Sequence, residues 1–130
     1  VFILMTLLAE GHEAQAGKVY QWLTWNGGGA NSSGVGIAHI DAQGDVHPDQ
    51  FWQEVTLGNV KERPFSQIWQ DESNPWLRDL MNRLPLLKGR CATCQWKPLC
   101  GGSFRVRAQF AYGDPWAPDP ACYLTDEEIG

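Results

Sequence analysis

The sequence lacks the basic surface and the long apolar segment that several classes of protein require. It has only 10 Lys and Arg against 15 Asp and Glu, a formal net charge of −5, which argues against a nucleic-acid-binding role because phosphate contacts need cations. Its one apolar run, "VFILMTLLA" at residues 1–9, is too short to cross a bilayer, for which about 20 residues are needed. The run also lacks the basic flank and the cleavage site of a signal peptide. We therefore expect a cytoplasmic protein that binds neither nucleic acid nor membrane.

Internal repeats and low-complexity tracts are also missing, and the chain starts at Val1 instead of a methionine. A length of 130 residues allows one domain at most, with a modest core. The non-methionine start is what we expect of a segment of a longer protein.

Cysteine is scarce, but the few cysteines are concentrated. Three of the four lie within "CATCQWKPLC", and the full spacing is Cys-x2-Cys-x5-Cys-x21-Cys, formed by Cys91, Cys94, Cys100 and Cys122. Disulfides are the weakest interpretation, because no secretory signal is visible and the chain is long enough to form a core. Four thiolates suit either tetrahedral zinc or a cubane iron–sulfur cluster, and the spacing alone leaves both open.

The residues around the cysteines are unusually basic. Residues 88–107 contain five of the ten Lys and Arg and no Asp or Glu. Nearby cations lower the cost of burying an anionic four-thiolate site. Gly101 and Gly102 directly follow Cys100, where the backbone can approach closely and direct N–H groups at sulfur.

Periodicity and turn residues predict an α+β fold made of short elements. We expect a helix over 12–25, a hairpin over 35–48 around "DAQG", short helices starting at Pro64 and Pro75, and a helix within 103–113 ending at Gly113. The helix at Pro75 should be capped by Ser73 or Asn74, stopped by Pro85 and Gly89, and should bury Trp76, Leu77, Leu80 and Leu84. All four cysteines would then lie in loops.

Several stretches of the sequence resemble a known family. "CATCQWKPLCGGSFRVRAQFAYGDPWAPDPACYLTDEE" resembles the C-terminal auxiliary-cluster domain, of the SPASM or twitch type, of radical S-adenosylmethionine (radical SAM) enzymes. Upstream, "NSSGVGIAHIDAQGDVHPDQFW" and "LGNVKERPFSQIW" are similar to the NirJ family of haem d1 biosynthesis. The resemblance implies a small SPASM/twitch-like α+β domain over 27–130, with a β-hairpin, short helices and cysteine-bearing loops around a metal cluster. Residues 1–26 would be the truncated C-terminal end of the radical SAM core, a helix from a partial (β/α) barrel.

The resemblance also implies a ligand set. Many full SPASM domains place a cluster ligand just after the hairpin turn, but here the strand reads "VHPDQF" with no cysteine. We infer a single auxiliary [4Fe-4S] cluster on the four cysteines, an inference that would fail if His47 or Asp49 ligated metal. The core motif Cys-x3-Cys-x2-Cys is absent from this sequence. S-adenosylmethionine and a second [4Fe-4S] cluster would therefore belong to the missing core, and this segment should be inactive alone.

The implied function is that of an accessory domain in a radical SAM enzyme acting on an iron-tetrapyrrole. In the haem d1 branch the reaction would be removal of propionate side chains, with the auxiliary cluster in electron transfer or substrate positioning. Two alternatives stay open: the accessory domain of a peptide-modifying enzyme (RiPP or sulfatase maturation), and a stand-alone structural zinc module.

Five residues are candidates for contacts with the substrate: Asn31, Ser32, Ser33, His47 and Arg105. The Gly- and Ser-rich turn around residues 31–33 could bind carboxylates through backbone N–H groups, or it could be only a connector. His47 could meet the tetrapyrrole, although a hairpin histidine more often packs or forms a hydrogen bond. Arg105 could pair with a propionate, but Arg107 could not join it on one helix face.

Overall fold

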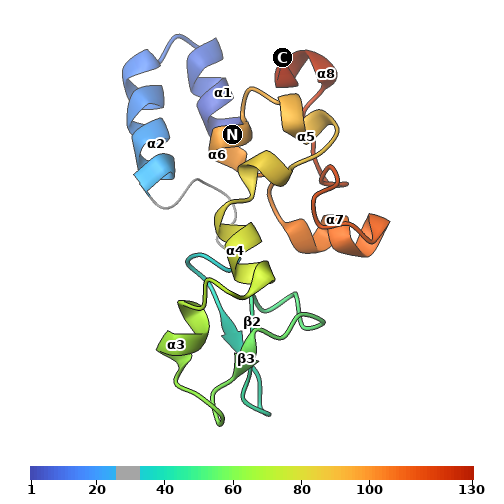
Figure 1. Ribbon diagram of the computed structural model, residues 1–130. Helices are drawn as coiled ribbons and strands as arrows, with labels where there is room; N and C mark the ends of the chain where they lie inside the picture. Colours follow the sequence, from blue (N-terminus) through green and yellow to red (C-terminus); the bar gives the residue numbers. More distant parts are fainter. Residues whose placement is uncertain (26–32) are drawn as a thin grey trace.

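The computed structural model describes residues 1–25 and 33–130, and it shows short helices around a small antiparallel sheet (Figure 1). In chain order the elements are α1 (Phe2–Ala9), α2 (Glu13–Trp25), β1 (His39–Ile40), β2 (Asp45–His47), β3 (Gly58–Asn59), α3 (Phe65–Trp69), α4 (Pro75–Met81), the 3₁₀ helix η1 (Leu84–Leu86), α5 (Arg90–Thr93), α6 (Lys97–Cys100), α7 (Arg105–Tyr112) and α8 (Asp126–Ile129). The predicted α+β class is confirmed. In the part of the chain that the structure describes, no helix is both long and apolar enough to cross a membrane.

The three strands pair in the order β1-β2-β3, all antiparallel, with His39 opposite His47 in the first pair. The predicted turn is present: the Gly44 N–H donates to the Asp41 carbonyl at 3.0 Å, and Gly44 adopts a φ of +92° that favours glycine. The Asp41 carboxylate also accepts from the N–H groups of Gln43 and Asp45, both at 2.9 Å. These bonds fix the register of the hairpin.

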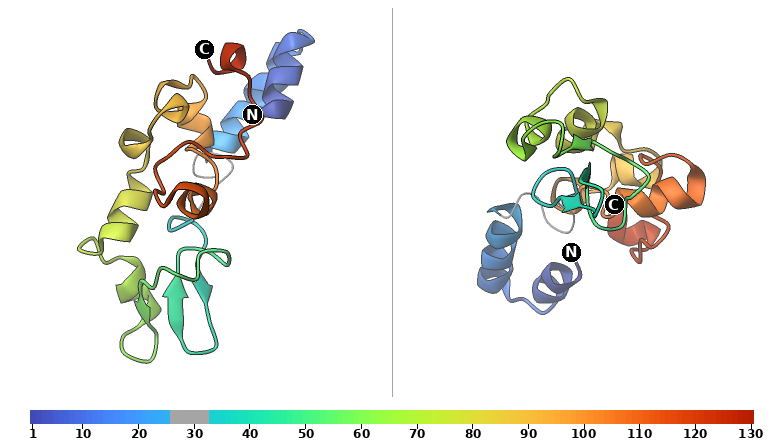
Figure 2. Two further views of the ribbon diagram at one scale, coloured as in Figure 1. Left: turned by 90° about the vertical axis from the view of Figure 1, so that its right-hand side faces the viewer. Right: turned by 90° about the horizontal axis from the view of Figure 1, so that it is seen from below.

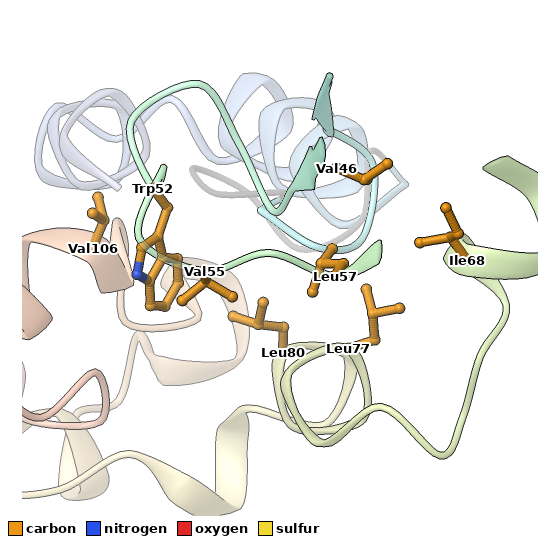
Figure 3. Close-up of a cluster of buried hydrophobic side chains, with 8 residues drawn as sticks. All are labelled: Val46, Trp52, Val55, Leu57, Ile68, Leu77, Leu80 and Val106. Atoms are coloured by element: carbon orange, nitrogen blue, oxygen red, sulfur yellow. The ribbon is translucent and has the colours of Figure 1, made fainter. Parts of the chain in front are cut away.

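Eight buried side chains form the main core between the sheet, α3, α4 and α7 (Figure 3). They are Val46, Trp52, Val55, Leu57, Ile68, Leu77, Leu80 and Val106. Trp52 is fully buried and stands edge-on to Trp76, with ring centroids 5.2 Å apart. Because Val106 belongs to α7, this core joins the sheet lobe to the part of the chain that follows the third cysteine.

Helix α4 starts as predicted but ends earlier. The Asn74 side chain accepts from the Trp76 N–H at 3.0 Å, so Asn74 is the N-cap, and Leu77 and Leu80 are buried. The expectation that Leu84 is buried is wrong, since it is 36% exposed. The ring of Pro85 would clash with the carbonyl four residues earlier in a continued α-helix, so the helix ends at Met81 and a 3₁₀ turn follows.

A second, smaller core lies under the first two helices. The predicted helix at 12–25 is confirmed as α2, and the apolar run before it forms α1, a helix that the sequence pattern did not predict. Leu4 of α1, Ala16 of α2 and Leu99 of α6 are buried together. Figures 1 and 2 show α1 and α2 side by side, next to the cysteine-bearing segment. The proposed boundary at residue 26 stays a prediction, and these two helices pack on the cysteine segment.

Candidate metal centre

All four cysteines line one cavity of about 310 Å³. Each is half-buried and none forms a disulfide. Among the described residues, no group of three or more His, Cys, Asp or Glu side chains is close enough to hold a single metal ion. The four thiols thus surround a space and do not converge on one point.

Two short helices position three of the thiols, so the expectation that the cysteines all lie in loops is wrong. Cys91 lies within α5, and Cys94 ends that helix by adopting an extended conformation, with φ −60° and ψ 128°. Cys100 is the last residue of α6, whose first turn contains Pro98, a residue whose fixed φ favours helix initiation. The sequence pattern missed these helices because each has only four residues.

The backbone after Cys100 turns sharply around its sulfur. Gly101, Gly102 and Ser103 have φ values of +58°, +78° and +57°. Burial raises the pKa of the Cys100 thiol, while the N–H groups of Gly102 and Ser103 act in the opposite direction as donors to it. This is the arrangement expected from the Gly-Gly pair, with Ser103 as a further donor.

Cys122 is held by a turn that Asp119 organises. The Cys122 N–H donates to the Asp119 carbonyl at 3.1 Å, and the Asp119 carboxylate accepts from the Ala121 N–H at 3.1 Å. Arg107 of α7 forms an ion pair with the same carboxylate, its Nε lying 2.9 Å from Oδ1. Burial by itself would raise the pKa of Asp119, but Arg107 and the Ala121 N–H hold it below its ordinary value. Helix α7 therefore positions the fourth thiol through a buried carboxylate.

The C-terminal segment closes over the first two thiols. The Arg90 guanidinium donates to the Leu124 carbonyl at 2.6 Å, and the Gln95 N–H donates to the Ile129 carbonyl at 2.9 Å. The indole N–H of Trp96 donates to the Glu128 carbonyl at 3.0 Å, and Trp96 packs on the smaller core under α1 and α2. These bonds keep residues 124–129 beside the segment that carries Cys91 and Cys94.

Arg105 is fully buried and engaged with the backbone. Its Nη1 donates to the carbonyls of Pro115 (3.0 Å) and Ala117 (2.7 Å), and its Nη2 donates to the Gly102 carbonyl. Burial lowers the pKa of Arg105, and the nearby Cys91, Asp119 and Cys100 partly oppose that shift. In this arrangement Arg105 ties the loop before Cys122 to the turn after Cys100. Its contact with a substrate carboxylate stays a prediction.

Of the other candidates for substrate contact, the two that the structure describes, Ser33 and His47, do not line the cysteine cavity. Asn31 and Ser32 fall outside the described residues. Ser33 is buried and its hydroxyl donates to the Asp49 carboxylate, which also accepts from the Phe51 and Trp52 N–H groups. Ser33 and Asp49 therefore lie in the sheet lobe, away from the cysteine cavity.

His47 lies in β2, in the sheet lobe that Figure 1 shows apart from α5 and α6. It is buried, with Nδ1 2.8 Å from the Val55 carbonyl and Nε2 3.2 Å from the Asp41 carboxylate. Both ring nitrogens therefore have protein partners. A substrate role for His47 remains a prediction that nothing in this geometry supports.

Sequence reasoning missed several residues that line the cavity, among them Asp119 and Phe104. The repeated Asp-Pro pair in "DPWAPDPAC" was a signal for Asp119, because an Asp just before a turn commonly accepts backbone N–H bonds. Phe104 carried no such signal, since a single aromatic residue before a helix reads as part of a core.

The sequence matches one family model and several known proteins. Residues 33–95 match SPASM, described as an iron-sulfur cluster-binding domain. The chain is 52% identical, over 99% of its length, to Fe-coproporphyrin III synthase of Methanosarcina barkeri, and covers 32% of that protein. It is 55% identical, over 78% of its length, to pre-heme d1 synthase of Dinoroseobacter shibae, and covers 25% of it. It is also 37% identical, over 68% of its length, to an AdoMet-dependent heme synthase of M. barkeri, covering 24%.

The chain thus spans about a third or less of the length of these relatives. No solved structure matches it significantly.

Proposed function

We propose that this chain, which belongs to the SPASM iron–sulfur domains of the radical SAM haem-synthase family, holds one [4Fe-4S] cluster on Cys91, Cys94, Cys100 and Cys122. The observation that carries the proposal is that these four thiols line a single cavity, although the last is 22 positions after the third. Four thiolates complete the ligand set of a cubane cluster.

The charges around the cavity fit an anionic cluster. Arg90, Lys97 and Arg107 line the cavity together with the cysteines. Asp119, the one acid among the described lining residues, is paired with Arg107. The N–H groups of Gly102 and Ser103 are placed to donate to a ligating sulfur at Cys100. Cations and N–H donors near the sulfurs stabilise the reduced, more negative state of such a cluster.

The main chemical rival is zinc on the same thiols. A structural zinc site draws four ligands onto one ion, with Zn–S distances of about 2.3 Å. The matching family is described as iron–sulfur cluster-binding. This description supports a cluster over a single zinc ion.

At the level of the whole enzyme, we propose that the chain serves a radical SAM enzyme acting on an iron-tetrapyrrole. The relatives reported above are named for Fe-coproporphyrin III, pre-heme d1 and heme, which favours a tetrapyrrole over a peptide substrate. S-adenosylmethionine and a second [4Fe-4S] cluster would be bound by the remainder of that enzyme. The specific step we propose is the propionate removal of haem d1 biosynthesis. The equally similar Fe-coproporphyrin III synthase makes the corresponding coproporphyrin step the second candidate.

A cluster bound here supplies one-electron transfer. The chain's own residues would hold it and limit its contact with water, since the buried Leu124 and Ile129 line the cavity with the thiols. With all four ligand positions filled by cysteine, electron transfer is favoured over direct binding of substrate to the cluster.

Anaerobic reconstitution with iron and sulfide tests the proposal. We expect about four irons and four sulfides per chain, with a broad absorption near ~400 nm that dithionite bleaches. Cys122→Ser should lose this cluster, whereas Thr93→Ser, a change at an exposed position between the first two thiols, should keep it. One tightly held zinc without sulfide would contradict the proposal, and four irons on Cys122→Ser would remove that residue from the ligand set.

A further inference from the structure

A second groove, of about 510 Å³, lies against α7 and is lined by Phe51, Phe104, Val106, Arg107 and Phe110. Phe51 and Phe110 are 57% and 65% exposed, which is unusual for large aromatic side chains that gather in one place. The rings of Phe51 and Phe104 stand edge to face, with centroids 6.2 Å apart and an angle of 87°. Apart from Arg107, all the side chains of this groove are apolar.

The groove shares a wall with the cysteine cavity. Phe104 and Arg107 line both spaces. Phe104 directly precedes α7, and Arg107 lies in its first turn, so one short stretch of chain separates the two spaces. A molecule in the groove would therefore lie next to the cluster-binding thiols.

Among the described residues that line the groove, Arg107 alone is charged. Its guanidinium carbon lies 4.9 Å from the centroid of the Phe104 ring, and Nε and Nη2 donate to Asp119 and Ser103. Among the residues that the structure describes, none accepts a hydrogen bond from Nη1. The groove thus offers aromatic faces for an apolar planar surface. It also offers a carboxylate the Nη1 edge of a guanidinium whose other two nitrogens bind Asp119 and Ser103.

We propose that this groove binds the flat face of a carboxylate-bearing aromatic macrocycle, with Arg107 at one of its carboxylates. This inference rests on the proposed function and names the place on the chain where the iron-tetrapyrrole would sit. A polypeptide would need partners for its backbone N–H and C=O groups, which the apolar side chains of this groove do not supply. A planar macrocycle has no such requirement on its faces and is recognised by stacking.

The test is a titration of the reconstituted 130-residue chain with iron coproporphyrin, followed by quenching of tryptophan fluorescence. Phe110→Ala and Phe51→Ala should each weaken binding roughly three- to tenfold, the range expected for loss of one aromatic contact. Tyr112→Ala is the matched control, because Tyr112 is on the same helix, is 59% exposed and does not line the groove. It should change binding by less than about twofold.

The charged edge is tested with the tetramethyl ester of the same macrocycle, added from a dimethyl sulfoxide stock. Loss of the carboxylates should weaken binding to the unchanged chain about two- to fivefold, as for an exposed ion pair. Unchanged binding in both phenylalanine variants, or an equal loss in Tyr112→Ala, would overturn the inference. So would sedimentation showing that the groove instead joins two copies of the chain, with Phe110→Ala restoring monomers.

Iron and sulfide are measured on every sample, which separates this inference from the proposed function. A chain that loads its cluster but binds the macrocycle equally well in all variants refutes the groove and leaves the cluster proposal intact. A chain that takes up no cluster refutes the proposed function by its metal content, whatever the macrocycle does.

Discussion

Gly102→Ala is the substitution whose effect the structure defines most sharply. The φ of Gly102 is +78°, a region that costs a residue with a Cβ about 1–2 kcal/mol. An added Cβ would lie 2.6 Å from Leu87 Cδ2 and 2.9 Å from Arg105 Cζ. The leucine methyl can move, but the guanidinium is held by the carbonyls of Pro115 and Ala117. Relieving such overpacking costs about 1–3 kcal/mol, so we expect a total loss of about 2–5 kcal/mol in the free energy of unfolding.

The neighbouring glycine provides the matched control. Gly101 also has a positive φ, +58°, but a Cβ there would meet only Arg83 Cδ, at an ordinary 3.6 Å. Gly101→Ala should therefore cost only the backbone contribution of about 1–2 kcal/mol. Urea unfolding of the metal-free chain, followed by tryptophan fluorescence, measures both losses. Equal losses in the two variants would refute the argument that Gly102 is required by its contact with Arg105.

The same pair of variants links stability to the site. Displacing Arg105 should loosen the loop that leads to Cys122, because Arg105 holds its carbonyls. Gly102→Ala should then retain fewer irons per chain after reconstitution than Gly101→Ala does. If both variants bound the full and equal amount of iron, the hydrogen bonds of Arg105 to this loop would not be what positions the thiol of Cys122.

Two further predictions concern the sheet lobe. Trp52→Ala removes a fully buried indole and should lower the free energy of unfolding by about 3–5 kcal/mol in urea, against less than about 1 kcal/mol for the exposed Tyr112→Ala. Hydrogen bonds from Ser73, and next from Arg63, hold the pKa of Asp71 below its ordinary value of 3.8. The stability that these bonds contribute is therefore present above pH 3.8. It is lost as the pH falls through the pKa of Asp71 in the folded state. The urea midpoint of the unchanged chain should therefore fall more steeply below pH 4 than that of Asp71→Asn, and parallel curves would contradict this.

Elements with a local physical cause could be predicted from the sequence. The Asp-to-Gly spacing at residues 41–44 set the hairpin turn, and Asn74 before a proline marked the start of α4. Gly113 ends α7 in the left-handed conformation expected of a C-cap glycine. Each of these signals acts within a few residues, so no knowledge of the tertiary structure was needed.

The elements that were missed depend on contacts distant in the sequence. The run at residues 1–9 reads as a helix only once Leu4 has Ala16 and Leu99 to pack against. The four-residue helices that carry Cys91 and Cys100 are too short to show a hydrophobic period. The sequence could not show that the guanidinium of Arg105 is buried among carbonyl groups, because those groups belong to a loop ten and more residues further along the chain.

That the four cysteines hold one metal group stays a prediction, but the structure shows how they come to line one cavity. The family match ends at residue 95, before Cys100 and Cys122, so those two thiols must be brought to the cavity by the chain that follows. Arg105 and Arg107 are two positions apart on α7 and therefore point in different directions, as the sequence indicated. That divergence lets one arginine hold the carbonyls of residues 115 and 117 while the other holds Asp119, so the returning loop is bound at successive points before Cys122. The 21 residues between the third and fourth thiols thus form a helix and a loop that is hydrogen-bonded to it. The two arginines determine where this loop places the thiol of Cys122.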